Sequence, residues 1–415
     1  MSNDMDGVHQ KPDCLTVIDG GVTAPSGFRA AGVACGLKKS KRDLALIVSE
    51  KKASAAGVFT QNVVKGHSLQ LCRRSISDHK AQAVVINSGN ANACVGPDGF
   101  ADAEKMAACA AEHIGCTPSD VLTGSTGVIG QRLNIDAVTF GIDLAFGQLS
   151  DSREAARAAE TAILTTDLRP KSCAVTCQVG GRQITIGGMA KGSGMIHPNM
   201  ATMIAVLTTD CQIEPMHLQA LLSQAVNPTF NRISVDGDTS VCDMVVVLAN
   251  GMAGNTVIDP GSEGEQILLQ ALTYVCSQLA QQIVADGEGA TKMVDIRVKG
   301  ARDAADAYRI VQSVGRSPLV KTALFGEDAN WGRILTAAGY SGADFDPAGC
   351  DIYLGDLQVC SGGLAVAFDE MKAKQILKQN SILIQINLQD GSASDHLWTC
   401  DFSDGYIRIN GSYRS

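Results

Sequence analysis

The sequence predicts an α+β fold, in which helices pack on largely antiparallel sheets to form a layered α/β sandwich. Two observations favour this class over a doubly wound fold. The strand-like segments are short, rich in β-branched residues and bounded by Gly or Asp, and they span residues 43–50, 81–89, 242–251 and 381–391. The helical segments do not alternate with the strands one by one, and several follow clusters of strands; they span residues 101–116, 152–166, 263–287 and 369–379.

Each segment also predicts its own surroundings. In residues 381–391, Ile382, Ile384 and Ile386 share one face and mainly polar residues, with Leu383, share the other, which predicts a half-buried antiparallel strand. The stretch CDMVVVLANG (242–251) is apolar on both faces and predicts a central strand. In residues 263–287, apolar side chains recur at helical spacing and predict a helix that lies on a sheet.

Composition excludes several classes of protein. The 415 residues, 45% apolar and 19% charged, predict a globular protein of two domains or one large two-lobed unit. The net charge of −9 and the aromatic content of 4% argue against nucleic acid and against a membrane surface as partners. The polar N-terminus is unlike a signal peptide, and no apolar run approaches the ~20 residues of a membrane span. We therefore expect a soluble cytoplasmic protein.

Common site patterns are missing from the sequence. Neither GGMAKGSG (187–194) nor GSTGVIG (124–130) has the residue order of a nucleotide-binding loop. The acidic stretch DGDTSVCD (236–243) is followed by Val247, where a calcium-binding EF-hand requires Glu. The fourteen cysteines are scattered without a Cys-x-x-Cys pair, so free thiols are expected rather than a metal site. No cofactor and no metal are expected.

Thr202 stands where a glycine-rich loop meets the apolar run MIAVL. A threonine hydroxyl is a weak nucleophile unless a base lies beside it, and the α-amino group of an N-terminal threonine can be that base. Its ordinary pKa of about 7.7–8.0 suits neutral pH. Cutting the bond between Ala201 and Thr202 would create such a terminus, and TGSTGVIG would supply donors for an oxyanion. The spacing alone also fits a threonine that simply opens a strand.

Longer stretches of the sequence decide between a nucleophilic threonine and one that simply opens a strand. GGMAKGSGMIHPNMATM (187–203) resembles the autoprocessing signature of the ornithine acetyltransferase family, the bifunctional glutamate N-acetyltransferases of arginine biosynthesis. Further blocks in family order lie along nearly the whole chain: GGVTAPSGFRAAGVACGLK (20–38), NSGNANA (87–93), TGSTGVIG (123–130), TTD-x-x-PK (165–171), FNRISVDGDTS (230–240), DGEGATK (286–292), FGEDANWGRI (325–334) and YIRINGSYRS (406–415).

The resemblance implies a precursor that cuts itself between Ala201 and Thr202. The α chain, residues 1–201, and the β chain, residues 202–415, would stay together as a heterotetramer of two α and two β chains. The implied fold is the layered sandwich of the DmpA/ArgJ-like type. The implied reaction moves the acetyl group of N2-acetyl-L-ornithine to L-glutamate through an acetyl-threonine intermediate; whether acetyl-CoA is also a donor stays open.

The resemblance also assigns roles to individual residues. Thr202 would be the nucleophile, and Thr126 and Gly127 would form the oxyanion hole. The remaining substrate contacts that it implies, besides Thr202 itself, are Thr165, Lys191, Glu288, Asn410 and Ser415. Lys191 can hold a carboxylate and Glu288 an ammonium. Thr166 adjoins Thr165, and only one of the two needs to face the substrate.

The chain departs from the family pattern at two places. DGDTSVCD has Val241 and Cys242 where the family often has Thr and Asn, which we interpret as a packing change; the chain ends in Ser415, where Thr is common. Two rival hypotheses remain. One is an N-terminal-threonine amidase or aminopeptidase, in which water replaces glutamate. The other is an uncut relative that acts as a binding or scaffold protein.

Overall fold

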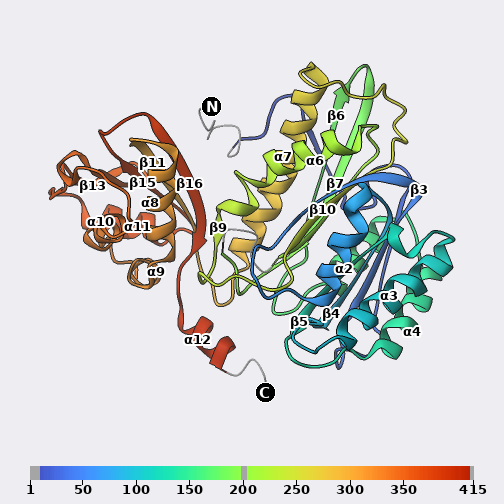
Figure 1. Ribbon diagram of the computed structural model, residues 1–415. Helices are drawn as coiled ribbons and strands as arrows, with labels where there is room; N and C mark the ends of the chain where they lie inside the picture. The colour runs from blue at the N-terminus through green and yellow to red at the C-terminus, as the bar shows by residue number, and fades with distance from the viewer. Residues whose placement is uncertain (1–9, 198–202, 412–415) are drawn as a thin grey trace. The chain divides into compact units, whose positions relative to one another are not determined.

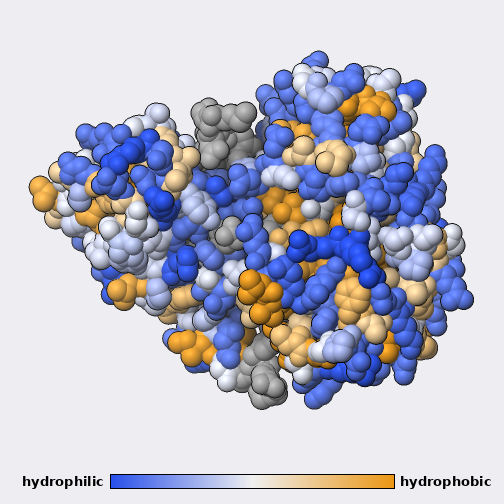
Figure 2. Space-filling view, viewed as in Figure 1, coloured by the Kyte–Doolittle hydropathy of each residue, from blue (hydrophilic) through white to orange (hydrophobic). Residues whose placement is uncertain are grey.

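The computed structural model describes residues 10–197 and 203–411, which form two compact units. The large unit comprises residues 10–231 and 238–283, and the small unit comprises residues 232–237 and 284–411. Both units combine sheets with helices, so the predicted α+β class is confirmed (Figure 1). Hydrophilic residues cover most of the surface seen in Figure 2, and hydrophobic residues lie between them in small groups, as is usual for a folded chain.

The large unit is built on a nine-stranded sheet within the described residues. Eight strands follow the order β1-β6-β7-β8-β10-β3-β4-β5, and β2 pairs with part of the long strand β3. Most neighbours are antiparallel, but β8–β10 and β4–β5 are parallel. The strands are β1 (Thr16–Ile18), β2 (Phe28–Val33), β3 (Leu44–Phe59), β4 (Lys80–Asn90), β5 (Val121–Val128), β6 (Lys171–Val179), β7 (Arg182–Lys191), β8 (Ile204–Thr209) and β10 (Met244–Ala249).

Helices cover both faces of this sheet, which explains why its strands are apolar on both sides. In β4, Val84 and Ile86 point into one apolar cluster, while Ala83 and Val85 point into another. The second cluster lies under α3 (Asp98–Ile114) and α4 (Ile135–Phe146), which run side by side in Figure 1. The first lies under α2 (His67–Ser75) and α5 (Arg153–Ala162). The strand β10 is fully buried between β8 and β3, as predicted for a central strand.

Two further helices complete the large unit, α6 (Pro215–Val226) and α7 (Glu263–Ala285). By length and composition α7 is apolar enough to cross a membrane, although no such run was expected from the sequence. A core helix passes the same test, and 56% of the apolar window of α7 is buried. The side chains of Val275 and Leu279 lie directly over Gly188 of β7, so α7 lies on the sheet as its periodicity predicts.

The small unit has a seven-stranded sheet among the described residues, in the order β14-β13-β12-β15-β11-β16-β9. The expected alternation in β15 is confirmed, since Ile382, Ile384 and Ile386 are buried and the residues between them are partly exposed. The expected antiparallel pairing is half wrong, because β15 is antiparallel to β12 but parallel to β11. The strands are β9 (Ile233–Ser234), β11 (Met293–Ala301), β12 (Asp351–Leu354), β13 (Leu357–Ser361), β14 (Leu364–Ala365), β15 (Ser381–Asn387) and β16 (Ala393–Cys400).

The structure contains more helices than the sequence analysis predicted. In the small unit, α11 (Glu370–Leu377) matches a predicted segment. Four others were not expected: α8 (Ala304–Arg316), α9 (Pro318–Phe325), α10 (Trp331–Gly339) and α12 (Asp404–Gly411). All fourteen cysteines are free thiols, as expected, and ten of them lie in buried positions where they act as small apolar side chains.

Candidate functional site

The predicted oxyanion-hole residues lie at the end of β5, beside the end of β4. Thr126 is buried, and Gly127 pairs with Gly89, where the register of the two strands becomes irregular. Gly127 has a φ of +134°, which disfavours any residue with a side chain. A Cβ on Gly127 would also come within 2.3 Å of the Gly89 carbonyl carbon. Glycine is therefore required here for two independent reasons.

A buried hydrogen-bond network holds the strand ends together beneath Thr126. Ser125 Oγ donates to Asn87 Oδ1 at 2.5 Å and lies 2.7 Å from Ser68 Oγ. Asn92 Nδ2 lies 3.2 Å from Ser68 Oγ and donates to the Gly99 carbonyl at 2.8 Å. Because buried polar groups are costly without partners, a network of this kind fixes one arrangement of its strands. Asn87 and Asn92 belong to the NSGNANA block, whose role the sequence did not indicate.

A second group of predicted residues surrounds Asp167, which follows α5. The buried Lys171 amine lies 2.7 Å from Asp167 Oδ1, and the buried Lys191 amine lies 3.9 Å from Oδ2. Backbone N–H groups of Gly192 and Thr165 also donate to this carboxylate, at 2.7 and 3.0 Å. Asp167 therefore holds both Thr165 and Lys191 in place. Thr165 and Thr166 are both partly exposed.

The charges in this group are strongly coupled. Burial by itself would raise the pKa of Asp167, but Lys191, Lys171 and the backbone donors outweigh it and hold that pKa well below its ordinary value. Two buried ammonium groups thus share one carboxylate, which leaves a net positive charge. Such a surplus suits a negatively charged ligand.

Asp243 is a buried acid that sequence reasoning missed. Its Oδ1 accepts a hydrogen bond of 3.0 Å from the backbone N–H of Met203, the residue after Thr202. Its Oδ2 is buried without a hydrogen-bond partner of ordinary geometry in the described chain. Burial raises the pKa of Asp243 well above its ordinary value, and the Met203 N–H, the Thr60 hydroxyl and the Lys191 charge only partly offset this effect. Burial therefore favours the protonated, neutral form of the Asp243 side chain.

One of the two departures from the family pattern, at Val241 and Cys242, lies next to Asp243. Val241 and Cys242 are buried and pack against Ala91 and Ala93 of the NSGNANA block. Cys242 Sγ also lies 3.5 Å from the Ala91 carbonyl oxygen. These contacts support the interpretation of the departures as a packing change.

The remaining substrate residues that the resemblance implies belong to the small unit. Glu288 is 6% exposed, and Asn410 on α12 donates to its Oε2 at 2.8 Å. Glu288 and Asn410 are thus brought together, as are Thr165 and Lys191 in the large unit. Ala201, Thr202 and Ser415 lie outside the described residues. Thr202 belongs to the connection between β7 and β8, which are adjacent antiparallel strands.

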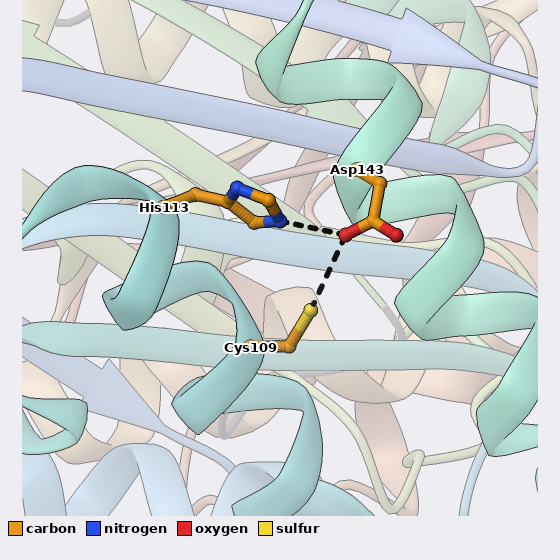
Figure 3. Close-up of side chains that lie close together, drawn as sticks. All are labelled: Cys109, His113 and Asp143. Atoms are coloured by element: carbon orange, nitrogen blue, oxygen red, sulfur yellow. Dashed lines mark hydrogen bonds and ion pairs between the residues drawn. The ribbon is translucent and has the colours of Figure 1, made fainter.

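Among the described residues, one group of side chains has the composition of a metal site. Cys109 and His113 of α3 and Asp143 of α4 bring their donor atoms within 4.8 Å of one another (Figure 3). His113 Nε2 lies 2.6 Å from Asp143 Oδ1, and the His113 ring stacks on Phe146. Burial and the nearby Asp143 raise the pKa of Cys109 to about 11, so its thiol stays protonated. A surface hydrogen bond between His113 and Asp143 accounts for this group.

Comparison with known proteins connects these groups to a family. The model of the ArgJ family matches residues 29–415. The chain is 49% identical over 399 residues to the "Arginine biosynthesis bifunctional protein ArgJ" of Symbiobacterium thermophilum, a match that covers 95% of this chain and 99% of that protein. It is 48% identical over 405 residues to the protein of the same name in Caldanaerobacter subterraneus, covering 97% and 100%.

Among solved structures, the ornithine acetyltransferase of Mycobacterium tuberculosis complexed with ornithine is 38% identical to this chain. That comparison covers 44% of this chain and 98% of that one, with a TM-score of 0.42. The family model and the relatives, which are nearly half identical over almost their whole lengths, lead to one conclusion: this chain belongs to the ArgJ family.

Proposed function

We propose that the protein is an acetyltransferase of arginine biosynthesis that moves the acetyl group of N2-acetyl-L-ornithine to L-glutamate. The products are L-ornithine and N-acetyl-L-glutamate. The observation that carries the proposal is the family match over residues 29–415, with relatives named as bifunctional proteins of arginine biosynthesis. By the same relationship we propose acetyl-CoA as a second acetyl donor. Fourteen free thiols favour a reducing compartment, the cytoplasm.

The protein matures by cutting its own chain between Ala201 and Thr202. The Thr202 hydroxyl attacks the Ala201 carbonyl, and the peptide C–N bond breaks as the amide nitrogen gains a proton. Water then hydrolyses the ester, which frees both the Thr202 hydroxyl and its α-amine. The cut lies between β7 and β8, so it would sever a connection without removing a strand from the sheet.

The order of strands explains how the two products would stay together. Residues 202–415 supply β8 and β10, which lie side by side in the middle of the large sheet. Residues 1–201 supply β7 on one side of this pair and β3 on the other. Separating the products would therefore break strand pairing along two edges at once. We propose that two such αβ units form the heterotetramer.

Turnover uses the new terminus as nucleophile and base. The Thr202 α-amine takes the hydroxyl proton while the oxygen attacks the acetyl carbonyl, and Thr126 and Gly127 donate to the oxyanion. The C–N bond breaks, ornithine leaves with the proton, and an acetyl ester remains on Thr202. The amine of glutamate attacks that ester and regenerates the Thr202 hydroxyl.

The charged residues suit the charges of these substrates. Lys191, held beside Asp167, presents its ammonium to a substrate carboxylate. Glu288 presents its carboxylate to the side-chain ammonium of ornithine, and Asn410 orients Glu288. Thr165 and Ser415 add hydroxyl contacts.

Transfer from each donor tests the proposal. The purified protein is incubated with N-acetylornithine or acetyl-CoA, with and without glutamate, and N-acetylglutamate is measured. Formation of N-acetylglutamate is expected with both donors. Acetate release that is independent of glutamate would instead identify the amidase, and absence of both products together with an uncut chain would identify the scaffold protein.

A further inference from the structure

Lys38 occupies a defined place in the loop between β2 and β3. Its backbone N–H donates to Asp43 Oδ2 at 2.9 Å, and the N–H of Cys35 donates to Asp43 Oδ1 at 2.6 Å. Asp43 is fully buried, so the loop is fastened to the core at two points. The position of Lys38 is thereby set by the fold rather than by chance contacts of an exposed loop.

The Lys38 side chain joins the two groups of site residues in the large unit. Its Cγ lies 3.1 Å from where a Cβ on Gly89 would stand, and Gly89 pairs with Gly127. Its Nζ donates to the Leu164 carbonyl at 2.9 Å, next to Thr165. The amine also interacts electrostatically with Asp167 and Lys191. The aliphatic part of the Lys38 side chain thus lies beside Gly89, the partner of Gly127, and its amine lies near Asp167.

Lys38 differs from the two other lysines near Asp167 in its exposure to solvent. Lys171 and Lys191 are almost fully buried beside Asp167, whereas Lys38 is partly exposed. Within the described residues, the Lys38 amine makes one hydrogen bond, to a neutral carbonyl, out of the three that it can donate. It also lies beside a carboxylate that two other ammonium groups already share. An anion is the ligand that such an arrangement favours.

We propose that Lys38 is a specificity-determining residue that donates a hydrogen bond to the α-carboxylate of the amino-acid substrates. This inference rests on the proposed acetyl transfer. In an N-acetyl amino acid the carboxylate carbon is three bonds from the acetyl carbonyl carbon, so it must bind close to the oxyanion hole. Lys38 meets that requirement because its stem passes over Gly89, the partner of Gly127.

The protonation of Lys38 provides a second way to observe this role. Burial lowers the pKa of Lys38 to about 8; Asp43 and Asp167 oppose this change, and Lys41 and Lys191 add to it. Between about pH 7 and pH 9 the free enzyme therefore loses the charge that binds the carboxylate. An arginine in its place would stay charged over that range.

Three variants test the proposal: Lys38→Met, Lys38→Arg and the matched control Lys39→Met, whose lysine is adjacent and exposed. For each, kcat/KM is measured for N-acetylornithine and for glutamate from pH 7 to pH 9. Lys38→Met should lower both values about tenfold or more, the usual effect of losing a hydrogen bond to a charged group. Its kcat should change less than threefold, and Lys39→Met should match the wild type. The ratio of the kcat/KM of Lys38→Arg to that of the wild type should rise with pH.

A substrate analogue separates binding from a structural role. The wild type should have a lower kcat/KM for N-acetylornithine α-carboxamide than for N-acetylornithine. Lys38→Met should show little difference between these two substrates. Equal losses by Lys38→Met on the carboxylate and the carboxamide, or unchanged kcat/KM values, would overturn the assignment. Failure of the proposed function looks different, because the wild type itself would then transfer no acetyl group.

Discussion

Replacing Asp167 by Asn tests whether this carboxylate holds the candidate site together. The substitution keeps the size of the side chain but removes its charge. Lys171, at 2.7 Å, and Lys191, at 3.9 Å, would then be two buried ammonium groups without a carboxylate between them. Removing one partner of a buried ion pair commonly costs about 3–5 kcal/mol. We expect Asp167→Asn to destabilise the protein by an amount in that range.

The loss of stability caused by Asp167→Asn should also depend on pH. The pKa of Asp167 is lowered in the folded protein, because the lysines and the backbone donors outweigh burial. A carboxylate of this kind contributes stability above the ordinary Asp pKa of about 3.9 and loses that contribution as pH falls toward its folded value. The difference between wild type and Asp167→Asn should therefore be full at pH 7 and shrink below about pH 4.

Urea unfolding of single-chain proteins measures this difference. Both forms carry Thr202→Ala, so that self-cleavage does not make stability depend on the association of two chains. Asp19→Asn is the matched control, because Asp19 pairs with Arg153 at 3.3 Å but is 89% exposed. Surface pairs contribute about 0–1 kcal/mol. The claim that Asp167 stabilises this group would be wrong if Asp167→Asn lowered the free energy of unfolding no more than the control does. It would also be wrong if the loss persisted unchanged at pH 3.

Three further predictions concern other residues. Gly127→Ala should lower kcat about 10²–10³-fold by displacing the oxyanion donors, whereas Gly339→Ala, where a Cβ meets nothing within 4 Å, should not; steady-state assays compare the two. Glu288→Gln should lower kcat/KM for N-acetylornithine about tenfold or more and affect glutamate less, because it removes the charge that we propose for binding the ornithine ammonium; equal losses on both substrates would contradict this. Asp243→Asn should gain stability over wild type as pH rises above the ordinary Asp pKa of about 3.9, since burial raises the pKa of Asp243 in the folded chain and the unfolded chain releases this proton first; thermal midpoints at about pH 4 and about pH 7 check the sign.

Much of the fold could be predicted from periodicity. The alternation in β15 and the apolar stripe of α7 are local patterns, and both determine which face is buried. Some missed helices also had local signals: Asp303 caps α8 and Ser317 caps α9, each by accepting a backbone N–H. The parallel pairing of β15 with β11 has no such signal, because it depends on how distant segments meet.

The site was predicted less completely, for a related reason. Family blocks predicted Lys191 and Thr165 as substrate residues, but they did not show that Asp167 joins them. Its partners lie up to 25 residues away in the sequence, so spacing alone could not reveal the group. Asp243 was not identified from the sequence for another reason. An aspartate in an acidic stretch is usually solvated, and only the structure shows that Asp243 is fully buried and that its pKa is raised.

The central claim is that Thr202 becomes a chain terminus and carries the acetyl group. Mass spectrometry of the intact protein, before and after N-acetylornithine is added without glutamate, tests it most directly. We expect two chains divided at Ala201–Thr202, whose masses together exceed the 43.3 kDa precursor by one water. After the donor is added, the chain that begins at Thr202 should gain one acetyl group. A single chain of 43.3 kDa, or an acetyl group carried by any other residue, would show that Thr202 is not the terminal nucleophile.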